Sequence, residues 1–161
     1  MIAKAATISH GGNAVRYSVN KDKAEIVKVN FLPDDISAEA MFQRMVLKQK
    51  EFSSIINKGR PLKRNVIRME ISPTKEESAG WTLADWVRLA NEYIRVFDSI
   101  DLSKKAKRAS AKFTNVKNSQ YVVALHHDAK SGIPHLHIDV NRVDMDGKVN
   151  DDHLIAERAM S

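Results

Sequence analysis

Histidine is concentrated in one short segment of this sequence. Four of the six histidines lie between residues 121 and 144. If residues 134–143 form a β-strand, side chains alternate between its two faces, so the imidazoles of His135 and His137 share one side. Their Cα atoms are then about 7 Å apart, close enough for both rings to bind one divalent ion. The polar face would carry His135, His137, Asp139 and Asn141, and the buried face Leu136, Ile138 and Val140.

A third imidazole is available on the preceding segment. Residues 121–127 have the composition of a second strand and end in His126 and His127. Residues 128–134 contain glycine and proline, which can turn the chain back into an antiparallel neighbour. Alternation favours His126 as the third ligand, because it lies opposite the bulkier, core-like residues of this strand. His127 is the alternative.

The absence of cysteine restricts the chemistry of such a site. With no thiolate in the sequence, a metal must be held by histidines and carboxylates. Three imidazoles suit Mn, Ni, Co or Zn, and suit Mg less well because Mg prefers oxygen ligands. We expect Mn or Mg in function, with Ni, Co or Zn as alternatives. Two carboxylates, Glu70 and Asp128, are candidates to hold a ligating imidazole through its other ring nitrogen.

Tyrosine is the candidate nucleophile. Tyr17 follows a glycine-rich turn and lies one turn into a short predicted helix capped by Asn13. Tyrosines are more often core aromatics with the hydroxyl at the rim, and composition alone leaves both roles open for Tyr17. The other two have structural roles in the predicted elements: Tyr93 lies on an apolar helix face and Tyr121 opens a strand.

These motifs resemble one family in combination. HLH followed by IDVN is similar to the His-hydrophobic-His motif of HUH endonucleases, specifically conjugative relaxases. The tail NRVDMDGKVNDD is similar to the family's N-R-V-x-x-x-G-K stretch. In ISHGGNAVRYSVNKDKAEIV, Tyr17 occupies the place of the nucleophilic tyrosine in relaxases of the Bacteroides mobilisation type. The family's His-x-Asp matches His126 and Asp128, although the loop that follows is longer than usual.

The resemblance implies a fold and an activity. The expected fold is α+β, with a five-stranded antiparallel sheet backed by helices and the two histidine strands at its centre. The expected activity is metal-dependent nicking of single-stranded DNA beside a hairpin at a plasmid or transposon transfer origin. Tyr17 would attack the phosphate and form a 5′-phosphotyrosyl intermediate. Accessory mobilisation proteins and a coupling protein are the implied partners.

Two other functions use the same residues. One is a DNA-binding accessory protein on the same fold that has lost catalysis; the presence of both Tyr17 and the histidine set argues against it. The other is a metal-dependent hydrolase that uses activated water, with Tyr17 in a structural role. The product distinguishes the three functions. A nicking transesterase leaves a covalent protein–DNA adduct, a hydrolase leaves a free 5′-phosphate, and an accessory protein leaves the DNA uncut.

Composition agrees with a globular DNA-binding protein. The 161 residues carry a net charge of +6 with a pI near 9.5, and we expect one nuclease domain over residues 1–161, consistent with truncation at its C-terminal end. Apolar runs are too short to span a membrane, and we expect a cytoplasmic protein. Six cations crowd one segment, which charge alone would assign to a solvated loop. In a chain with a metal site and a candidate nucleophile they are predicted to contact DNA phosphates: Lys104, Lys105, Lys107, Arg108, Lys112 and Lys117.

The remaining elements follow from hydrophobic periodicity. Strands are expected at Ile2–Ile8, at 24–32 and at Val66–Ser72. Long helices are expected from Ser37 to Gly59 and from Thr82 to Phe97, with Ile55 and Leu83 on their apolar faces. His10 and His153 lie outside the motif and are assigned to the surface or to DNA contacts.

Overall fold

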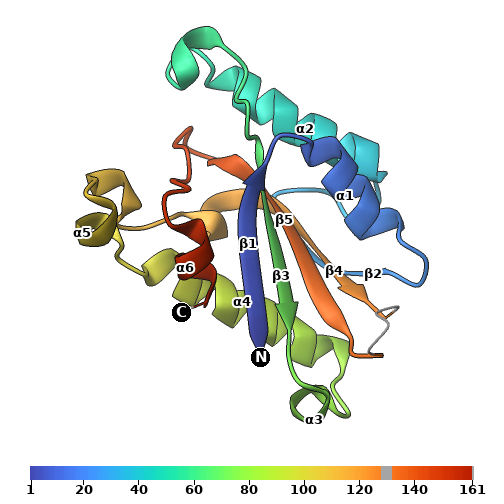
Figure 1. Ribbon diagram of the computed structural model, residues 1–161. Helices are drawn as coiled ribbons and strands as arrows, with labels where there is room; N and C mark the ends of the chain where they lie inside the picture. The colour runs from blue at the N-terminus through green and yellow to red at the C-terminus, as the bar shows by residue number, and fades with distance from the viewer. Residues whose placement is uncertain (128–131, 161) are drawn as a thin grey trace.

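One antiparallel β-sheet organises the molecule (Figure 1). The computed structural model describes residues 1–127 and 132–160, and the five strands found there are ordered β1-β3-β5-β4-β2. β5 is therefore central, with β3 and β4 as its neighbours. This confirms the expected α+β fold. The strands are β1 (Ile2–Ile8), β2 (Glu25–Asn30), β3 (Val66–Ser72), β4 (Ser119–His126) and β5 (His135–Asp144).

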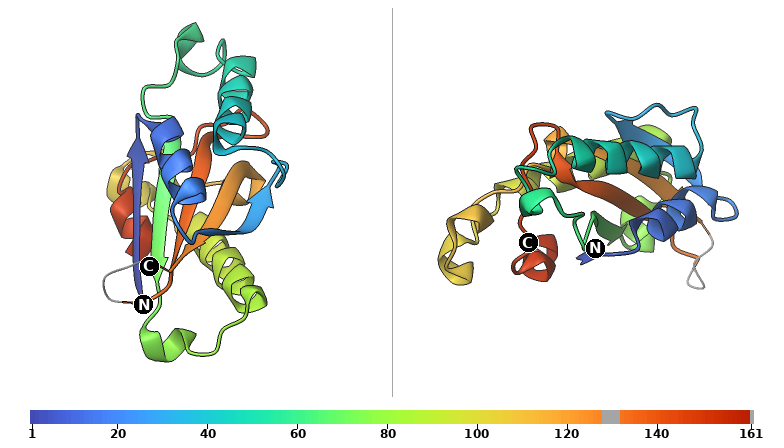
Figure 2. Two further views of the ribbon diagram at one scale, coloured as in Figure 1. Left: turned by 90° about the vertical axis from the view of Figure 1, so that its right-hand side faces the viewer. Right: turned by 90° about the horizontal axis from the view of Figure 1, so that it is seen from above.

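Helices cover both faces of the sheet (Figure 2). Buried residues of α1 (Gly11–Asn20) and α2 (Ala38–Glu51) form an apolar cluster with one face. α4 (Leu83–Ser99) and α6 (Ile155–Met160) supply the larger cluster on the other face. No helix in the described residues is long and apolar enough to cross a bilayer. The short helical segments are α3 (Lys75–Ser78), α5 (Ser103–Ala106), η1 (Asn57–Gly59), η2 (Ala109–Ala111) and η3 (Val116–Asn118).

The two faces of β5 differ as the alternation predicts. Leu136, Ile138 and Val140 are fully buried in the larger apolar cluster. His137, Asp139 and Asn141 point to the other face and are also buried. Asn141 shows what covers them, because its amide donates to the Met45 carbonyl of α2 at 3.1 Å. The chemically active face is thus a polar strip beneath two helices rather than an open surface.

The first helix begins earlier than the sequence suggests. α1 starts at Gly11, directly after His10, whose carbonyl accepts hydrogen bonds from the N–H groups of Asn13 and Ala14. Asn13 is therefore inside the helix, and its expected role as the cap is wrong. Its side-chain oxygen instead accepts a hydrogen bond from Arg16.

The two long helices also differ from expectation, α2 in where it ends and α4 in the exposure of its first turn. α2 ends at Glu51 rather than at Gly59, because the serine-rich segment that follows makes only short turns and Lys58 has a positive φ of 53°. Ile55 consequently lies in solvent, 77% exposed. α4 begins where expected, after Thr82, which forms a capping box with Asp85. Its first turn extends into solvent, so Leu83 is exposed and not on the buried face.

Candidate active site

Three imidazoles meet where β4 ends and β5 begins. His126 is paired in register with His135, and Ala124 with His137, so the antiparallel pairing alone brings the three rings to one end of the sheet. The ring centroids of His126 and His137 are 4.0 Å apart, and those of His135 and His137 are 4.9 Å apart. One nitrogen from each ring lies within 4.8 Å of the others. Nitrogens this close together could hold one metal ion after small ring rotations.

A backbone carbonyl fixes the orientation of His126. Its Nε2 lies 2.8 Å from the carbonyl oxygen of Ser18 in α1. A carbonyl only accepts, so Nε2 carries the proton and donates, and Nδ1 is the nitrogen that can bind a metal. His126 itself is completely buried. This arrangement, an imidazole held by a carbonyl through the nitrogen opposite the ligating one, is common among metal-binding histidines.

The neighbouring histidine lies outside the cluster. The Nε2 of His127 is 3.6 Å from a carboxylate oxygen of Glu25 on β2, and the side chain is 39% exposed. Of the two histidines proposed for the third ligand, only His126 points toward His135 and His137. Asp128, proposed to orient a ligating imidazole, lies outside the described residues.

Tyr17 lies against the histidine cluster. Its ring centroid is 5.6 Å from that of His126 and 5.7 Å from that of His137. The side chain remains 43% exposed, so the phenol borders both the buried imidazoles and solvent. Lys21, one turn further along α1, places its ammonium 3.4 Å from the phenol oxygen. The guanidinium carbon of Arg68 on β3 lies 5.8 Å from the centre of the tyrosine ring.

Tight packing sets the depth of α1 and hence the position of Tyr17. A Cβ added at Gly11 would come within 2.4 Å of Val66 Cγ2 and 2.6 Å of Asn65 Oδ1, closer than side-chain atoms approach without movement. Val15, one turn later, is fully buried in the cluster with α2. The helix is thus held close to the start of β3 at one end and to His126 at the other.

Two carboxyl groups lie beside the imidazoles. Glu70 on β3 has one oxygen 3.9 Å from the Nε2 atoms of both His135 and His137, near enough to contact either after a side-chain rotation. Asp139 is completely buried two residues beyond His137. Its burial raises its pKa from 3.8 to about 7, against the opposing effects of the Ser18 hydroxyl and the charge of Arg68.

Several residues of this site were not predicted from the sequence. Ser18 contacts His126 through its backbone carbonyl, which any residue type could supply. Strand alternation placed Asp139 on the face of His137, but it assigned no role to Asp139 or to Arg68, which shares its face with Glu70. Lys21 could have been found by the spacing of four residues from Tyr17. Asn141, on the same face of β5, accepts a hydrogen bond from Gln49 at 2.8 Å.

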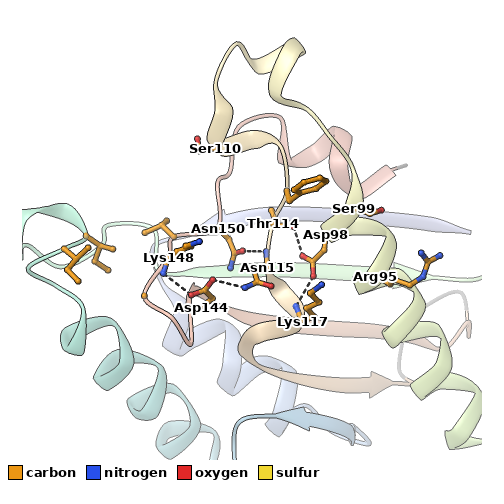
Figure 3. A pocket seen from close by; sticks show the side chains of 15 residues that line it. Arg95, Asp98, Ser99, Ser110, Thr114, Asn115, Lys117, Asp144, Lys148 and Asn150 are labelled. Carbon is orange, nitrogen blue, oxygen red and sulfur yellow. Dashed lines mark hydrogen bonds between the residues drawn. The ribbon is translucent and has the colours of Figure 1, made fainter.

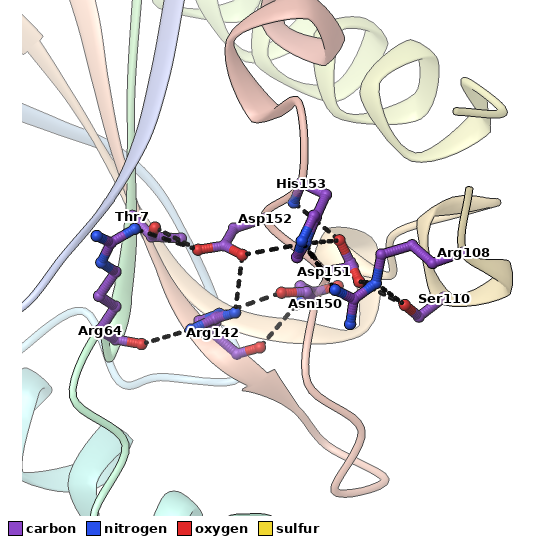
Figure 4. Close-up of polar contacts among 9 residues, drawn as sticks. All are labelled: Thr7, Arg64, Arg108, Ser110, Arg142, Asn150, Asp151, Asp152 and His153. Atoms are coloured by element: carbon purple, nitrogen blue, oxygen red, sulfur yellow. Dashed lines mark hydrogen bonds and ion pairs between the residues drawn. The ribbon is translucent and has the colours of Figure 1, made fainter. Parts of the chain in front are cut away.

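A second group of possible metal ligands consists of Asp151, Asp152 and His153 (Figure 4). Arginines already bind its carboxylates. Arg108 lies 3.0 Å from Asp151, and Arg142 lies 3.2 Å from Asp152. Ser110 and Thr7 also donate to these two aspartates. The group is therefore a network of ion pairs and hydrogen bonds that fastens the chain after β5.

The basic segment does not lie at the histidine cluster. It contacts the opposite end of β5, where the Asn115 amide donates to Asp144 at 3.0 Å. The two ends of β5 are about 30 Å apart at the usual rise per residue. Two of its six cations are engaged in ion pairs, Lys105 with Glu157 at 2.6 Å and Arg108 with Asp151. His10 is exposed at the start of α1.

A comparison with protein families identifies the chain. The model of the relaxase family "MobA/VirD2-like, nuclease domain" matches residues 17–161. The chain belongs to this relaxase family, as the histidine motif and Tyr17 had suggested. Membership supports a role in DNA nicking during mobilisation, and with it DNA binding. The finer placement in the Bacteroides mobilisation type stays a prediction. Neither the curated proteins nor the solved structures contain a match to this chain.

Proposed function

We propose that this chain nicks single-stranded DNA at a plasmid or transposon transfer origin by transesterification, with Tyr17 as the nucleophile. The observation that carries the proposal is the position of the phenol. Tyr17 is half exposed and lies within 6 Å of two rings of the histidine cluster. A DNA strand crossing α1 could therefore present one phosphate to the hydroxyl and to the histidines together.

The donor set fits a divalent ion. His126, His135 and His137 would hold it, with Mn²⁺ or Mg²⁺ as the proposed functional ion and Ni²⁺, Co²⁺ or Zn²⁺ as alternatives. Because the three imidazoles are neutral as ligands, a bound ion keeps its full charge and supplies Lewis-acid polarisation of the scissile phosphate. Ser18 and Glu70 would orient the rings from behind. We extend the same role to Asp128.

The chain's own residues account for the covalent step. The phenol oxygen of Tyr17 loses its proton and forms a bond to phosphorus, while the bond from phosphorus to the 3′ oxygen breaks and that oxygen takes up a proton. The products are a 5′-phosphotyrosyl chain and a free 3′-hydroxyl. Lys21 and Arg68 flank the tyrosine ring and would balance the negative charge of the phosphate during attack. The phosphodiester energy is retained for rejoining.

The wider setting is part of the proposal. We propose that the substrate carries a hairpin beside the nick and that accessory mobilisation and coupling proteins are partners, as the family resemblance implies. We place the reaction in the cytoplasm, where plasmid DNA resides. The six cations of the basic segment would bind DNA at a distance from the nick.

Replacement of Tyr17 by phenylalanine tests the nucleophile. Tyr17→Phe should reduce nicking and adduct formation by more than about a thousandfold, since it removes the attacking oxygen. The folded state and metal affinity should stay unchanged, because the side chain is partly exposed and does not bind the ion. The measurement is a denaturing gel of the chain with single-stranded oligonucleotides from its own element, followed by peptide mapping.

The products separate the alternatives. An adduct on the Tyr17 peptide supports the proposal. Nicking by Tyr17→Phe with a free 5′-phosphate would show a hydrolase, and DNA binding without cleavage by the unmodified chain would show an accessory protein. An adduct on Tyr93 or Tyr121 would refute the assignment of Tyr17.

A further inference from the structure

A cavity of about 870 Å³ lies at the end of the sheet where β5 finishes (Figure 3). Its walls come from the segment after α2, the end of α4, the segment before β4 and the turn after β5. Among the described residues that line it, none belongs to the histidine cluster. Its volume is in the range of ligand-binding sites, so the cavity is large enough for a nucleotide.

The acidic groups in its wall already bind the protein's own donors. The carboxylates of Asp98 and Asp144 are almost completely buried. Each accepts three hydrogen bonds of 2.7–3.0 Å that fix the surrounding turns. For Asp98 the donors are the Thr114 hydroxyl and the backbone N–H groups of Val116 and Lys117; for Asp144 they are the Asn115 amide and the backbone N–H groups of Asp146 and Lys148.

Two lysines of the cavity wall, by contrast, reach into solvent, while the third lining cation, Arg95, is paired with Glu92. The backbone N–H groups of Lys117 and Lys148 hold the two buried carboxylates, while their side chains are exposed on the cavity rim. No ion pair of either ammonium occurs among the residues that the structure describes. A ligand entering from solvent therefore meets the ammonium groups before the carboxylates, which favours an anionic ligand.

One aromatic side chain lines the same cavity and is largely uncovered. Phe113 is 57% exposed. The ammonium of Lys112 lies 5.5 Å from its ring centroid. An exposed aromatic ring that shares a cavity with lysines suits single-stranded nucleic acid, because the ring can stack on a base while the lysines contact the neighbouring phosphates.

We propose that this cavity binds single-stranded DNA, with one base stacked on Phe113 and the adjoining phosphates on Lys117 and Lys148. The inference rests on the proposed function, since it takes single-stranded DNA as the substrate. The bound nucleotides lie several positions from the nick, because the cavity and the histidine cluster are at opposite ends of β5, about 30 Å apart. The cavity is thus a second binding site for the strand, separate from the nicking site.

Truncation of the aromatic ring tests the stacking contact. Phe113→Ala should weaken binding of a fluorescent oligothymidine of about 20 nucleotides by about 5- to 150-fold, the usual range for a lost base–aromatic stack. Fluorescence anisotropy measures the affinity. Phe113→Tyr, which preserves the ring, should remain within about twofold of the unchanged chain. Leu83→Ala removes a similarly exposed apolar side chain from the opposite end of α4 and should have no effect.

The lysines give a second readout. Lys117→Ala and Lys148→Ala should each lower the slope of log affinity against log salt by about 0.7. Arg88→Ala, which removes a charge from the exposed surface of α4, is the matched control. Crosslinking of the same oligonucleotide containing 5-iodouracil should label the Phe113 peptide.

The outcomes are separable from those for nicking. Adduct formation on Tyr17 tests the proposed function, and oligothymidine affinity tests the cavity, so either can fail alone. Phe113→Ala that binds as tightly as Leu83→Ala, with no crosslink at Phe113, would overturn the inference and indicate another ligand for the cavity, such as a protein segment.

Discussion

The two ends of β5 carry similar residues in different surroundings. At its start, His126, His135 and His137 lie with potential ligand atoms within 4.8 Å of one another. Just beyond its end, Asp151, Asp152 and His153 meet the same criterion. The first group lies beside a half-exposed tyrosine, whereas arginines bind the carboxylates of the second. Proximity of ligand-type side chains is therefore a poor indicator of a metal site unless the atoms that already contact those side chains are considered.

Charge explains the difference. A cation entering the second group would have to displace guanidinium groups that already neutralise both carboxylates. The imidazoles of the first group are neutral when they bind a metal, so nothing has to leave and the charge of the ion remains for the substrate. The first arrangement suits reversible chemistry on a phosphate, and the second suits a permanent structural contact.

The largest expected effect distinguishes the two groups by metal binding. His137→Ala should weaken Mn²⁺ binding and nicking by at least about 100-fold, because it removes one of the three proposed ligands. His153→Ala should leave both within about twofold, since His153 is half exposed and lies outside the histidine cluster. Isothermal titration calorimetry measures the first quantity and a gel assay the second. Because His137 is buried, His137→Gln repeats the test with less lost volume. Equal losses at His137 and His153 would contradict the comparison.

A moderate effect is expected on stability at the second group. Burial alone would raise the pKa of Asp151, but the Ser110 hydroxyl, the His153 N–H and the charges of Arg108 and His153 lower it below the usual 3.8. A carboxyl with a depressed pKa stabilises the fold above its unfolded pKa and loses this contribution as pH falls through its folded pKa. Asp151→Asn should therefore cost about 1–3 kcal/mol at pH 7.

The pH dependence supplies the check on this prediction. In urea unfolding, the difference between Asp151→Asn and the unchanged chain should shrink below about pH 4, where the carboxyl becomes protonated. Glu92→Gln, at a solvent-exposed ion pair with Arg95, is the control and should stay within about 0.5 kcal/mol. A deficit for Asp151→Asn that is constant from pH 7 to well below 4 would mean that the carboxylate charge is irrelevant.

The smallest expected effect concerns the basic segment, residues 104–117. Lys104, Lys107 and Lys112 are exposed, whereas Lys105 is paired with Glu157. Neutralising the three exposed lysines should lower the salt slope of single-stranded DNA binding by up to about 2, with little change in stability. Lys105→Ala should change the slope less than any of the three. A triple variant with an unaltered slope would make the segment a solvated loop.

Strand alternation and the histidine spacing predicted much of the fold and the site. The two faces of β5 and the bounds of β1 and β3 followed from side-chain periodicity. The contact of His126 with Ser18 could not be predicted, because a carbonyl has no residue signature and the contact requires knowing that α1 crosses the sheet. The arginine network could not be predicted either. Arg64, Arg108 and Arg142 are far apart in the sequence and meet Asp151 and Asp152 only after folding.

The position of β5 also constrains the order in which the molecule assembles. β1 pairs with β3 and β2 pairs with β4, so two separate strand pairs exist until β5 inserts between β3 and β4 (Figure 1). β5 is the last of the five strands in the sequence, and such long-range pairing is slow to form. In a growing chain on the ribosome, β3 and β4 thus each expose one unpaired edge, and His126 meets His135 and His137 only when β5 closes the sheet.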